Sequence, residues 1–417
     1  MEESGCMSEL SVCRVCIWKN HLKEHYFMDE SKRLIFVTVV SSNYLHYAKA
    51  LAKSISQVHP ECRLAACVVD WDQVNAAETT VPIQWVLGKE LITEGEFPRY
   101  AFKYDALELT CSIKPRIVQW AFDRGYQNVV YLDGDFQLYH PLTEITGSAI
   151  DYSVCLTPHL LSSLPQDGRV PAEHNFLSAG AYNAGFVAIK NNKEGLRFNH
   201  WWIDRLSSDC IIDIADNRFV DQRWLDLVPS LFDGVRILRQ AGFHVAYWNL
   251  PNCEVTLDQA GKVLVDGHPL TLLHYSGFDP HDPSRISKYQ NRIDLMDYPE
   301  LSLLAKSFAA QLLQCDYDRH SQSVYRFSTM QDGTVIKPYW REAIRSNHEA
   351  LAGIDNPFDS TAYPNIYQRF LRAMPDVVDS RVDWRLNPNA ARKAQSQALT
   401  KLRKTWKKVS KYFRKAA

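Results

Sequence analysis

The sequence has no hydrophobic run long enough to cross a membrane. A membrane-spanning helix needs about 18 or more consecutive apolar residues, and no such stretch occurs in the 417 residues. The N-terminal residues Met1–Ser4 are not followed by the basic and then apolar segments of a secretory signal peptide. We therefore expect a protein that is made and kept in the cytoplasm.

The sequence also has almost no net charge and no dense cysteine framework. Its 47 Lys and Arg balance 48 Asp and Glu, and the formal net charge of −1 gives no general attraction to nucleic acid, so we expect no nucleic-acid partner. The 10 cysteines are scattered, mostly within apolar segments, unlike those of a small secreted disulfide-rich domain. We expect them to be reduced.

Residues 1–33 are polar and irregular, and they contain one pattern that suits a metal. Cys13 and Cys16 are followed by His21 and His25, at a spacing shorter than that of the common zinc finger. Two interpretations stay open, a zinc site or an N-terminal extension without a metal.

The composition is that of a globular protein with a sizeable core. Hydrophobic residues make up 46% of the chain and aromatic residues 12%, with 11 Trp. The length allows one large α/β domain and a smaller appended region. We expect an N-terminal extension over residues 1–33, the main domain over 34–290, a helical region over 291–390 and a basic tail over 391–417.

The first regular elements are predicted to be a strand, a helix and a second strand. Leu34–Val40 is an uninterrupted apolar run followed by the cap-type residues Ser41–Asn43, and Leu64–Val69 is a second apolar run. No Gly-x-Gly-x-x-Gly follows the first strand, which excludes a dinucleotide-binding fingerprint. A nucleotide can still lie across these strand ends with its base against Tyr44 or Trp71.

The most informative stretch is Asn128–Pro141, in which an apolar run stops at two aspartates separated by one glycine. Val129–Leu132 is predicted to be a buried strand, and Asp133 and Asp135 follow where it leaves the sheet. Ligands bind at this end of the strands in open α/β sheets, and paired carboxylates hold Mg²⁺ or Mn²⁺ while leaving positions for substrate phosphates. The alternative is a polar turn in which Asp and Gly serve turn chemistry.

Lys114 lies shortly before that stretch. A helical pattern runs from Tyr104 to Cys111, and Pro115 suits the first position of a new helix that ends at Gly125. Lys114 is thereby expected at a helix junction, either as a cation that neutralises a donor phosphate or as an ordinary surface lysine.

Three more polar clusters lie at the ends of later predicted elements. Asn183 and Gly185 precede an apolar run, and the glycine permits close approach of a ligand to the backbone. Asp221 stands where a helix is predicted to begin and can also be its N-cap. His274 directly follows a strand predicted over Leu270–Leu273.

In this order, the motifs resemble the glycogenin-like and lipopolysaccharide-galactosyltransferase-like family of retaining, metal-dependent glycosyltransferases with the GT-A fold. The likeness covers about residues 34 to 290 and is strongest to bacterial surface-polysaccharide glycosyltransferases. The segments that carry it are Leu132-Asp133-Gly134-Asp135, Tyr182-Asn183-Ala184-Gly185-Phe186, Phe219-Val220-Asp221-Gln222-Arg223-Trp224 and His274-Tyr275-Ser276-Gly277-Phe278-Asp279-Pro280.

The resemblance implies an α/β fold of the GT-A type, with an open mixed sheet flanked by helices and a helical C-terminal region. The implied activity is transfer of a hexosyl group from a nucleotide-diphosphate sugar to a glycan, glycolipid or other acceptor. Asp133, Asp135 and His274 would hold Mn²⁺ or Mg²⁺ against the donor diphosphate. The other implied site residues are Asn183, Gly185 and Gly277 at the substrate, Lys114 at the phosphate, Ser41 and Tyr44 at the base, and Asp221 and Gln222 at the anomeric carbon.

One segment departs from the family pattern. The family often has Lys-Pro-Trp shortly after its His-x-x-Gly motif, with the lysine at the diphosphate, whereas residues 278–283 read Phe-Asp-Pro-His-Asp-Pro. Arg285 and Lys288 are the candidate replacements.

Retention has two possible routes, double displacement through Asp221 or front-face attack in which the leaving phosphate accepts the proton of the acceptor. We favour front-face attack.

Two other functions stay open. Aspartate-phosphatase-like hydrolases also use Asp-x-Asp after a buried strand, but they expect Thr or Val two residues after the second Asp, where this chain has Phe136-Gln137. The other alternative is a carbohydrate-binding protein with a degenerate catalytic site.

The tail is basic and has no acidic residue from position 385 onward. Apolar residues recur in it at steps of three and four, which predicts an amphipathic helix. Such a helix suits an anionic membrane surface at the inner face of the cell membrane, where a lipid-linked acceptor would lie. The alternative is a solvated helix that packs on the helical region. The apolar positions are Leu399, Leu402, Trp406, Val409 and Phe413.

Overall fold

The computed structural model describes residues 33–74, 78, 82–93, 95–146, 151–346 and 353–363. The Cys13–His25 pattern and the basic tail lie outside these residues, so the zinc site and the membrane-binding helix stay predictions.

A seven-stranded sheet forms the centre of the fold, in the order β10-β6-β7-β4-β1-β2-β3. β7 runs antiparallel to both of its neighbours, and the other adjacent pairs are parallel. The predicted open mixed α/β sheet is therefore confirmed. The strands are β1 (Leu34–Val40), β2 (Leu64–Val68), β3 (Ile83–Leu87), β4 (Asn128–Leu132), β6 (Val154–Pro158), β7 (Tyr182–Lys190) and β10 (Val235–Ile237).

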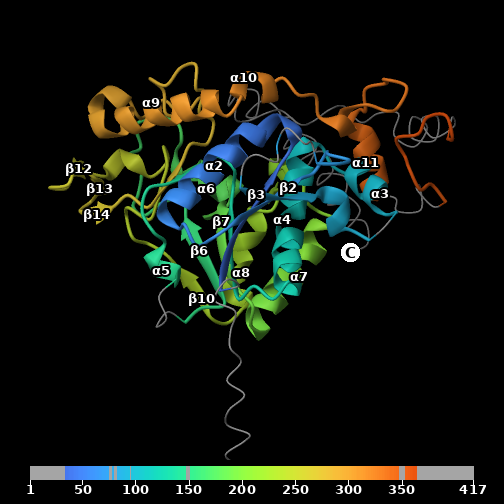
Figure 1. Ribbon diagram of the computed structural model, residues 1–417, viewed down its shortest axis with the longest axis horizontal. Coiled ribbons are helices and arrows are strands. Elements are labelled where there is room, and N and C mark those ends of the chain that lie inside the picture. Colours follow the sequence, from blue (N-terminus) through green and yellow to red (C-terminus); the bar gives the residue numbers. More distant parts are fainter. Residues whose placement is uncertain are drawn as a thin grey trace, which may run out of the picture.

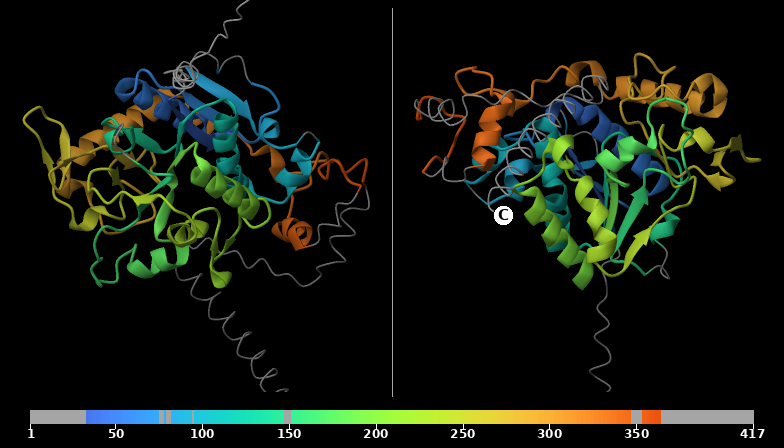
Figure 2. Two further views of the ribbon diagram at one scale, coloured as in Figure 1. Left: turned by 90° about the horizontal axis from the view of Figure 1, so that it is seen from below. Right: turned by 180° about the vertical axis from the view of Figure 1, so that it is seen from behind.

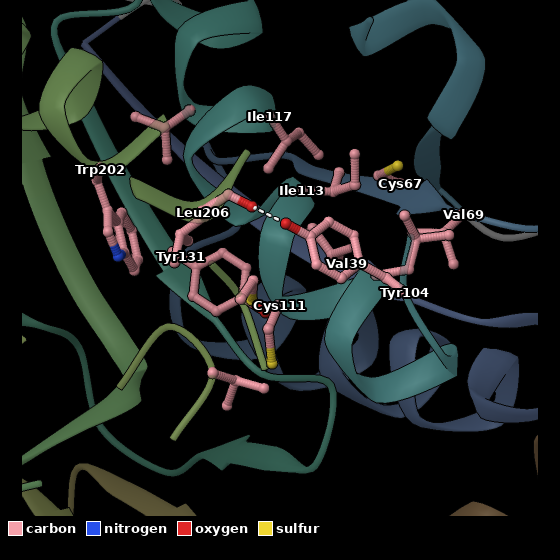
Figure 3. Packing of buried hydrophobic residues seen from close by; sticks show 14 of the residues in the cluster. Val39, Cys67, Val69, Tyr104, Cys111, Ile113, Ile117, Tyr131, Trp202 and Leu206 are labelled. Carbon is pink, nitrogen blue, oxygen red and sulfur yellow. Dashed lines mark hydrogen bonds between the residues drawn. The ribbon is translucent and has the colours of Figure 1, made fainter. Parts of the chain in front are cut away.

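Helices cover both faces of this sheet because its strands are apolar on both sides. In β1, Val37 and its alternate neighbours pack against α4 (Ala106–Asp123), while Phe36 packs against α2 (Leu45–Val58) on the opposite face. α7 (Lys193–Leu206) packs beside α4 and covers β6 and β7. Figure 1 shows these helices around the sheet. Figure 3 shows the core on the side of the sheet that α4 and α7 cover. There the Tyr104 hydroxyl donates to the carbonyl oxygen of Leu206 at 2.9 Å.

A second, three-stranded sheet continues directly from the first. Its order is β11 (His244–Val245), β15 (Leu272–His274) and β5 (Phe136–Leu138). β15 is antiparallel to β5 and parallel to β11. Only residues 133–135 separate β4 in the large sheet from β5 in the small one, so the two aspartates lie at the junction of the two sheets.

The other elements described before residue 290 are short. They are η2 (Ser42–Tyr44), η4 (Gly88–Leu91), α3 (Phe97–Phe102), α5 (Thr143–Thr146), α6 (Glu173–Ala179), β8 (Ile212–Asp213), η5 (Ile214–Asp216), β9 (Arg218–Phe219), η6 (Arg223–Leu227), α8 (Val228–Leu231), η7 (Leu250–Asn252), β12 (Val255–Leu257), β13 (Val263–Val265) and β14 (His268–Pro269).

The regular elements described between residues 291 and 363 are helices. The rest of the helical region predicted over 291–390, residues 347–352 and 364–390, lies outside the described residues. The described helices are η8 (Leu295–Asp297), α9 (Pro299–Gln314), α10 (Tyr317–His320), η9 (Arg326–Ser328) and α11 (Pro338–Ser346). α9 packs on α2, and its Phe308 stacks on Tyr275 with ring centroids 4.1 Å apart. α11 lies beside α3, which Figures 1 and 2 show. Arg341 of α11 donates to the carbonyl oxygen of Ala101 at 3.3 Å. Among the described residues, no helix has the length and apolar character needed to span a bilayer.

One predicted helix boundary is wrong. Pro115 does not begin a helix, because α4 continues through it without interruption. A proline inside a helix removes one backbone hydrogen bond and usually kinks or ends the helix. Here the fully buried Ile113 and Ile117 on either side of Pro115 pack into the same core, and this packing outweighs the local preference. Lys114 therefore lies within α4 and not at a helix junction.

Candidate active site

A cleft of about 980 Å³ opens at the ends of β1 and β4. Tyr317 and Ser321 of the helical region contribute to its wall. Trp71, the alternative partner for a nucleotide base, is not among the residues that line it and instead packs on Trp85 with ring centroids 5.4 Å apart. All the site residues expected from the sequence line this one cleft: Ser41, Tyr44, Lys114, Asp133, Asp135, Asn183, Gly185, Asp221, Gln222, His274 and Gly277.

Strand register brings the three expected metal ligands together. In the small sheet His274 is paired with Phe136, which directly follows Asp135. In the large sheet the last residue of β4, Leu132, is paired with Phe186 in the middle of β7, and the Asp133 amide donates to the carbonyl oxygen of Gly185 at 2.8 Å. Two separate strand pairings therefore place both aspartates and the histidine around one point.

The donor atoms at this point fit a divalent cation. One ligand atom from each of Asp133, Asp135 and His274 lies within 4.8 Å of the other two. Nε2 of His274 is 3.1 Å from Oδ1 of Asp135, and Phe136 stacks on the His274 ring at a centroid distance of 4.1 Å. Carboxylate oxygens suit Mg²⁺ and Mn²⁺, and a single imidazole is compatible with Mn²⁺ in particular.

Gly185 is required where these ligands converge. A Cβ atom at this position would lie 2.6 Å from Oδ1 of Asn183 and 2.9 Å from both Oδ2 of Asp133 and Cε1 of His274. Real Cβ atoms do not approach other atoms so closely, so any larger residue would push the ligands apart.

Lys114 joins this cluster to Asp221. The buried ammonium group is 2.9 Å from Oδ1 of Asp133 and 2.9 Å from Oδ2 of Asp221, and it donates to the carbonyl oxygen of Ala184 at 3.2 Å. Burial alone would lower the pKa of Lys114, but Asp133 and Asp221 hold that pKa well above its ordinary value. Lys114 is therefore a fixed cation whose hydrogen-bond donors face protein oxygens, and its role at a phosphate stays a prediction.

The pKa values of the two carboxylates paired with Lys114 shift in opposite directions. Burial would raise the pKa of Asp133, but Lys114 and then His274 lower it below its ordinary value, which keeps Asp133 ionised. At Asp221, which is 1% exposed, burial dominates and the pKa is raised despite Lys114.

The backbone before Asp221 is strained. Val220 has a φ of 39°, in the left-handed region that a β-branched residue rarely adopts. Asp221 does not cap the following helix, because Gln222 occupies the N-cap position of η6 and makes no side-chain cap bond. The N-cap alternative for Asp221 is thus wrong, and the strained turn instead delivers its carboxylate to Lys114.

A network of amide groups orients Asn183 and Gln222. Oδ1 of Asn183 accepts from the Gly185 amide at 2.9 Å, and its Nδ2 donates to Nε2 of His159 at 3.1 Å. Nε2 of Gln222 donates to the carbonyl oxygen of Ala179 at 3.0 Å. His159 was not predicted from the sequence, because no motif surrounds it and only the folded chain places it beside Asn183.

Ser41 and Tyr44, the residues expected at the base, line the cleft directly after β1. The Ser41 hydroxyl donates to Oδ1 of Asn43 at 2.6 Å, and Tyr44 stacks on Tyr47 with ring centroids 5.3 Å apart. Asp70, which follows β2, accepts from both the amide and the hydroxyl of Ser42 at 2.7 Å. These bonds fix the turn that carries the expected base-binding residues.

Gly277 and Lys288 also line the cleft, in the segment that follows β15. Gly277 has a φ of +75°, and a Cβ atom there would be 2.5 Å from the Tyr289 ring, so glycine is required. The Lys288 amide donates to the carbonyl oxygen of Gly277 at 3.0 Å. Of the two candidate replacements for the family lysine, Lys288 lines the cleft, and Arg285 is not among the lining residues.

Comparison with known proteins gives distant likenesses. No family model matches the chain. It is 27% identical over 252 residues to the uncharacterized protein YfnF of Bacillus subtilis (strain 168), covering 58% of this chain and 81% of YfnF. It is 33% identical over 101 residues to YfnD of the same strain, covering 24% of this chain and 32% of YfnD.

Among solved structures, one of the galactosyltransferase LgtC in complex with donor and acceptor sugar analogs is 16% identical, with a TM-score of 0.38, covering 65% of this chain and 95% of that chain. The glycosyltransferase GlyE of Streptococcus pneumoniae TIGR4 is 16% identical, with a TM-score of 0.35, and the match covers 69% of this chain and 64% of the GlyE chain. The bifunctional glycosyltransferase WbbM is 13% identical, with a TM-score of 0.38, and the match covers 68% of this chain and 52% of the WbbM chain. Likenesses at these TM-scores do not show a shared function.

Replacing Gly185 tests whether the ligands converge as described. We expect Gly185→Ala to lose Mn²⁺ binding, because the added methyl group displaces Asp133 and His274. Titration of Mn²⁺ followed by electron paramagnetic resonance measures the free ion. Leu303→Ala is the control, since Leu303 is an exposed residue of α9 and does not line the cleft. Full Mn²⁺ affinity in the Gly185 variant would show that the three ligands do not share one ion.

The buried His159 predicts acid sensitivity of the fold. Burial lowers its pKa from 6.5 to about 3, so below pH 6.5 the unfolded chain binds a proton that the folded chain does not. The stability that neutral His159 contributes is complete above 6.5 and is lost as the pH falls toward 3. From about pH 7 to pH 5 this loss is about 2 kcal/mol. Urea unfolding at both pH values should show a smaller loss for His159→Gln than for the wild type, whereas equal losses would contradict the assignment.

Proposed function

We propose that this protein is a metal-dependent GT-A glycosyltransferase that transfers a hexosyl group from a nucleotide-diphosphate sugar to a glycan, glycolipid or lipid-linked acceptor, with retention of anomeric configuration. The observation that carries the proposal is the convergence of Asp133, Asp135 and His274 in one large cleft at the strand ends. We also propose, from the sequence alone, that the main domain spans residues 34–290 and that the basic tail holds the protein at the inner face of the membrane.

The three ligands would hold Mn²⁺ or Mg²⁺ beside the two phosphates of the donor. When bound there, the ion would stabilise the negative charge that develops on the departing diphosphate, which is usually the largest catalytic contribution in such sites. Lys114 supports this from the protein side, because it keeps Asp133 ionised and in place.

Lys288 is the best candidate for a direct phosphate contact. Its side chain is exposed and belongs to the cleft wall, and its backbone is bonded to Gly277 beside the His274 motif. Lys114, by contrast, faces three protein oxygens. We therefore assign the diphosphate contact to Lys288 and the organisation of the carboxylates to Lys114.

The state of Asp221 favours front-face attack over double displacement. A carboxylate that is almost fully buried and ion-paired with Lys114 is a poor nucleophile, because attack would break that pair in the interior. In the front-face route, the bond from the anomeric carbon to the phosphate oxygen breaks and the acceptor oxygen bonds to the same face. The proton of the acceptor hydroxyl passes to the departing phosphate oxygen.

A donor-hydrolysis screen tests the function without knowledge of the acceptor. Slow hydrolysis of one nucleotide-sugar in the presence of Mn²⁺ is expected, because water can replace the acceptor. Asp135→Ala should abolish metal-dependent donor binding measured by calorimetry, while Asp204→Ala, at an exposed position on α7, should retain it. Mn²⁺-dependent nucleotide affinity that survives in the Asp135 variant, or phosphatase activity without sugar transfer, would refute the proposal.

The anomeric outcome is a separate prediction. We expect the configuration of the donor sugar to be kept in the product, because front-face attack forms the new bond on the side from which the phosphate departs. The coupling constant of the anomeric proton, measured by NMR on the purified product, reports the configuration. An inverted product would rule out both front-face attack and double displacement.

A further inference from the structure

A chain of buried polar side chains leads to the metal-binding edge of His274. While Nε2 of His274 faces Asp135, its Nδ1 lies 3.4 Å from Nε2 of His244. Nδ1 of His244 in turn lies 2.7 Å from the hydroxyl oxygen of Thr157. Thr157 is 1% exposed and both histidines are 4% exposed. The three side chains come from β6, β11 and β15, so the chain crosses from the large sheet into the small one.

The surroundings hold the two imidazoles in this arrangement. Phe136 packs on both rings, with centroids 4.1 Å from that of His274 and 4.9 Å from that of His244. Trp248 presents its ring edgewise to both, at 5.2 Å and 6.0 Å. The His244 backbone is fixed as well, because Nδ2 of Asn249 donates to its carbonyl oxygen at 2.8 Å.

A neutral imidazole has one N–H donor and one acceptor nitrogen, so the direction of one hydrogen bond sets the next. In one direction, Nε2–H of His274 donates to Asp135, Nε2–H of His244 donates to His274, and the Thr157 hydroxyl donates to His244. In the other direction, Nδ1–H of His274 donates to His244, and Nδ1–H of His244 donates to Thr157.

Only the second direction leaves a lone pair on Nε2 of His274 for a divalent cation. The reversal removes one proton from each Nε2 and places one on each Nδ1, so the proton count and the charge of the two rings do not change. Nδ1 of His244 has a partner in both directions because a hydroxyl group can donate or accept, and in the second direction the bound cation becomes the partner of Nε2 of His274.

We propose that Thr157 and His244 are positioning residues that set the tautomer of His274, and that the Thr157 hydroxyl allows the chain to reverse when a divalent cation binds Nε2. This inference rests on the metal site of the proposed function. Partners of metal-binding histidines commonly fix the tautomer in this way, but they are most often carboxylates or carbonyl groups, which can only accept.

Replacing the hydroxyl of Thr157 without changing its size separates this role from simple packing. In Thr157→Val, Nδ1–H of His244 would have no acceptor, so His244 keeps its proton on Nε2 and donates it to His274. The proton of His274 then stays on Nε2, where it competes with the cation. Thr157→Ser keeps the hydroxyl and is the matched control.

Mn²⁺ binding to the full chain, measured by electron paramagnetic resonance, tests the proposal. We expect Thr157→Val to weaken Mn²⁺ affinity about 10- to 100-fold, with Thr157→Ser binding as the wild type does. Wild-type affinity in the valine variant would overturn the role of the hydroxyl while leaving the proposed function intact. A wild-type chain that binds no Mn²⁺ would overturn both proposals.

The tautomer itself can be observed independently of affinity. Nitrogen-15 shifts of His274 and His244 distinguish Nδ1–H from Nε2–H, and Mg²⁺ avoids the paramagnetic broadening of Mn²⁺. We expect both rings to change from Nε2–H to Nδ1–H when Mg²⁺ saturates the wild type. If either ring keeps the same tautomer with and without Mg²⁺, the reversal does not occur.

Replacing His244 gives a second, independent comparison. His244→Phe removes the acceptor for Nδ1–H of His274, so Mn²⁺ affinity should fall. His244→Gln offers an amide oxygen at a similar reach and should recover affinity relative to the phenylalanine variant. Equal affinity of the two variants would show that His244 acts only by filling space.

Discussion

The ion pairs of Lys114 are the interaction on which the rest of the site depends. One buried ammonium group compensates two carboxylates that belong to different parts of the chain, Asp133 after β4 and Asp221 after the strained Val220. Removing one partner of a buried pair leaves an uncompensated charge and typically costs about 3–5 kcal/mol. Lys114 is thus a structural cation as much as a functional one, and a strained turn persists where its carboxylate reaches that cation.

The parts of the fold that follow from local pattern were predictable. Leu34–Val40 is a strand over the residues expected, because an uninterrupted apolar run suits a strand covered on both faces. The aspartates were found because polar residues at the end of a buried strand meet at one edge of the sheet. Pro115 was misjudged because its local preference to begin a helix is weaker than the packing of α4 on the sheet.

The parts of the site that depend on distant pairings were not predictable. His159, His244 and Thr157 have no recognisable spacing. The pairing of β6 with β7 brings His159 to Asn183, and the approach of β6, β11 and β15 brings Thr157 and His244 to His274. The left-handed backbone of Val220 was equally hidden, since a β-branched residue is the last from which such a conformation would be expected.

The pairing of β15 with β5 also determines when the site can exist during synthesis. Asp133 and Asp135 leave the ribosome early, whereas His274 is made only after the large sheet has been translated. A nascent chain that ends before β15 therefore carries two ligands and lacks the third. An ion that requires all three side chains would therefore bind only after the large sheet has been made, and until then the chain must rely on its apolar strands.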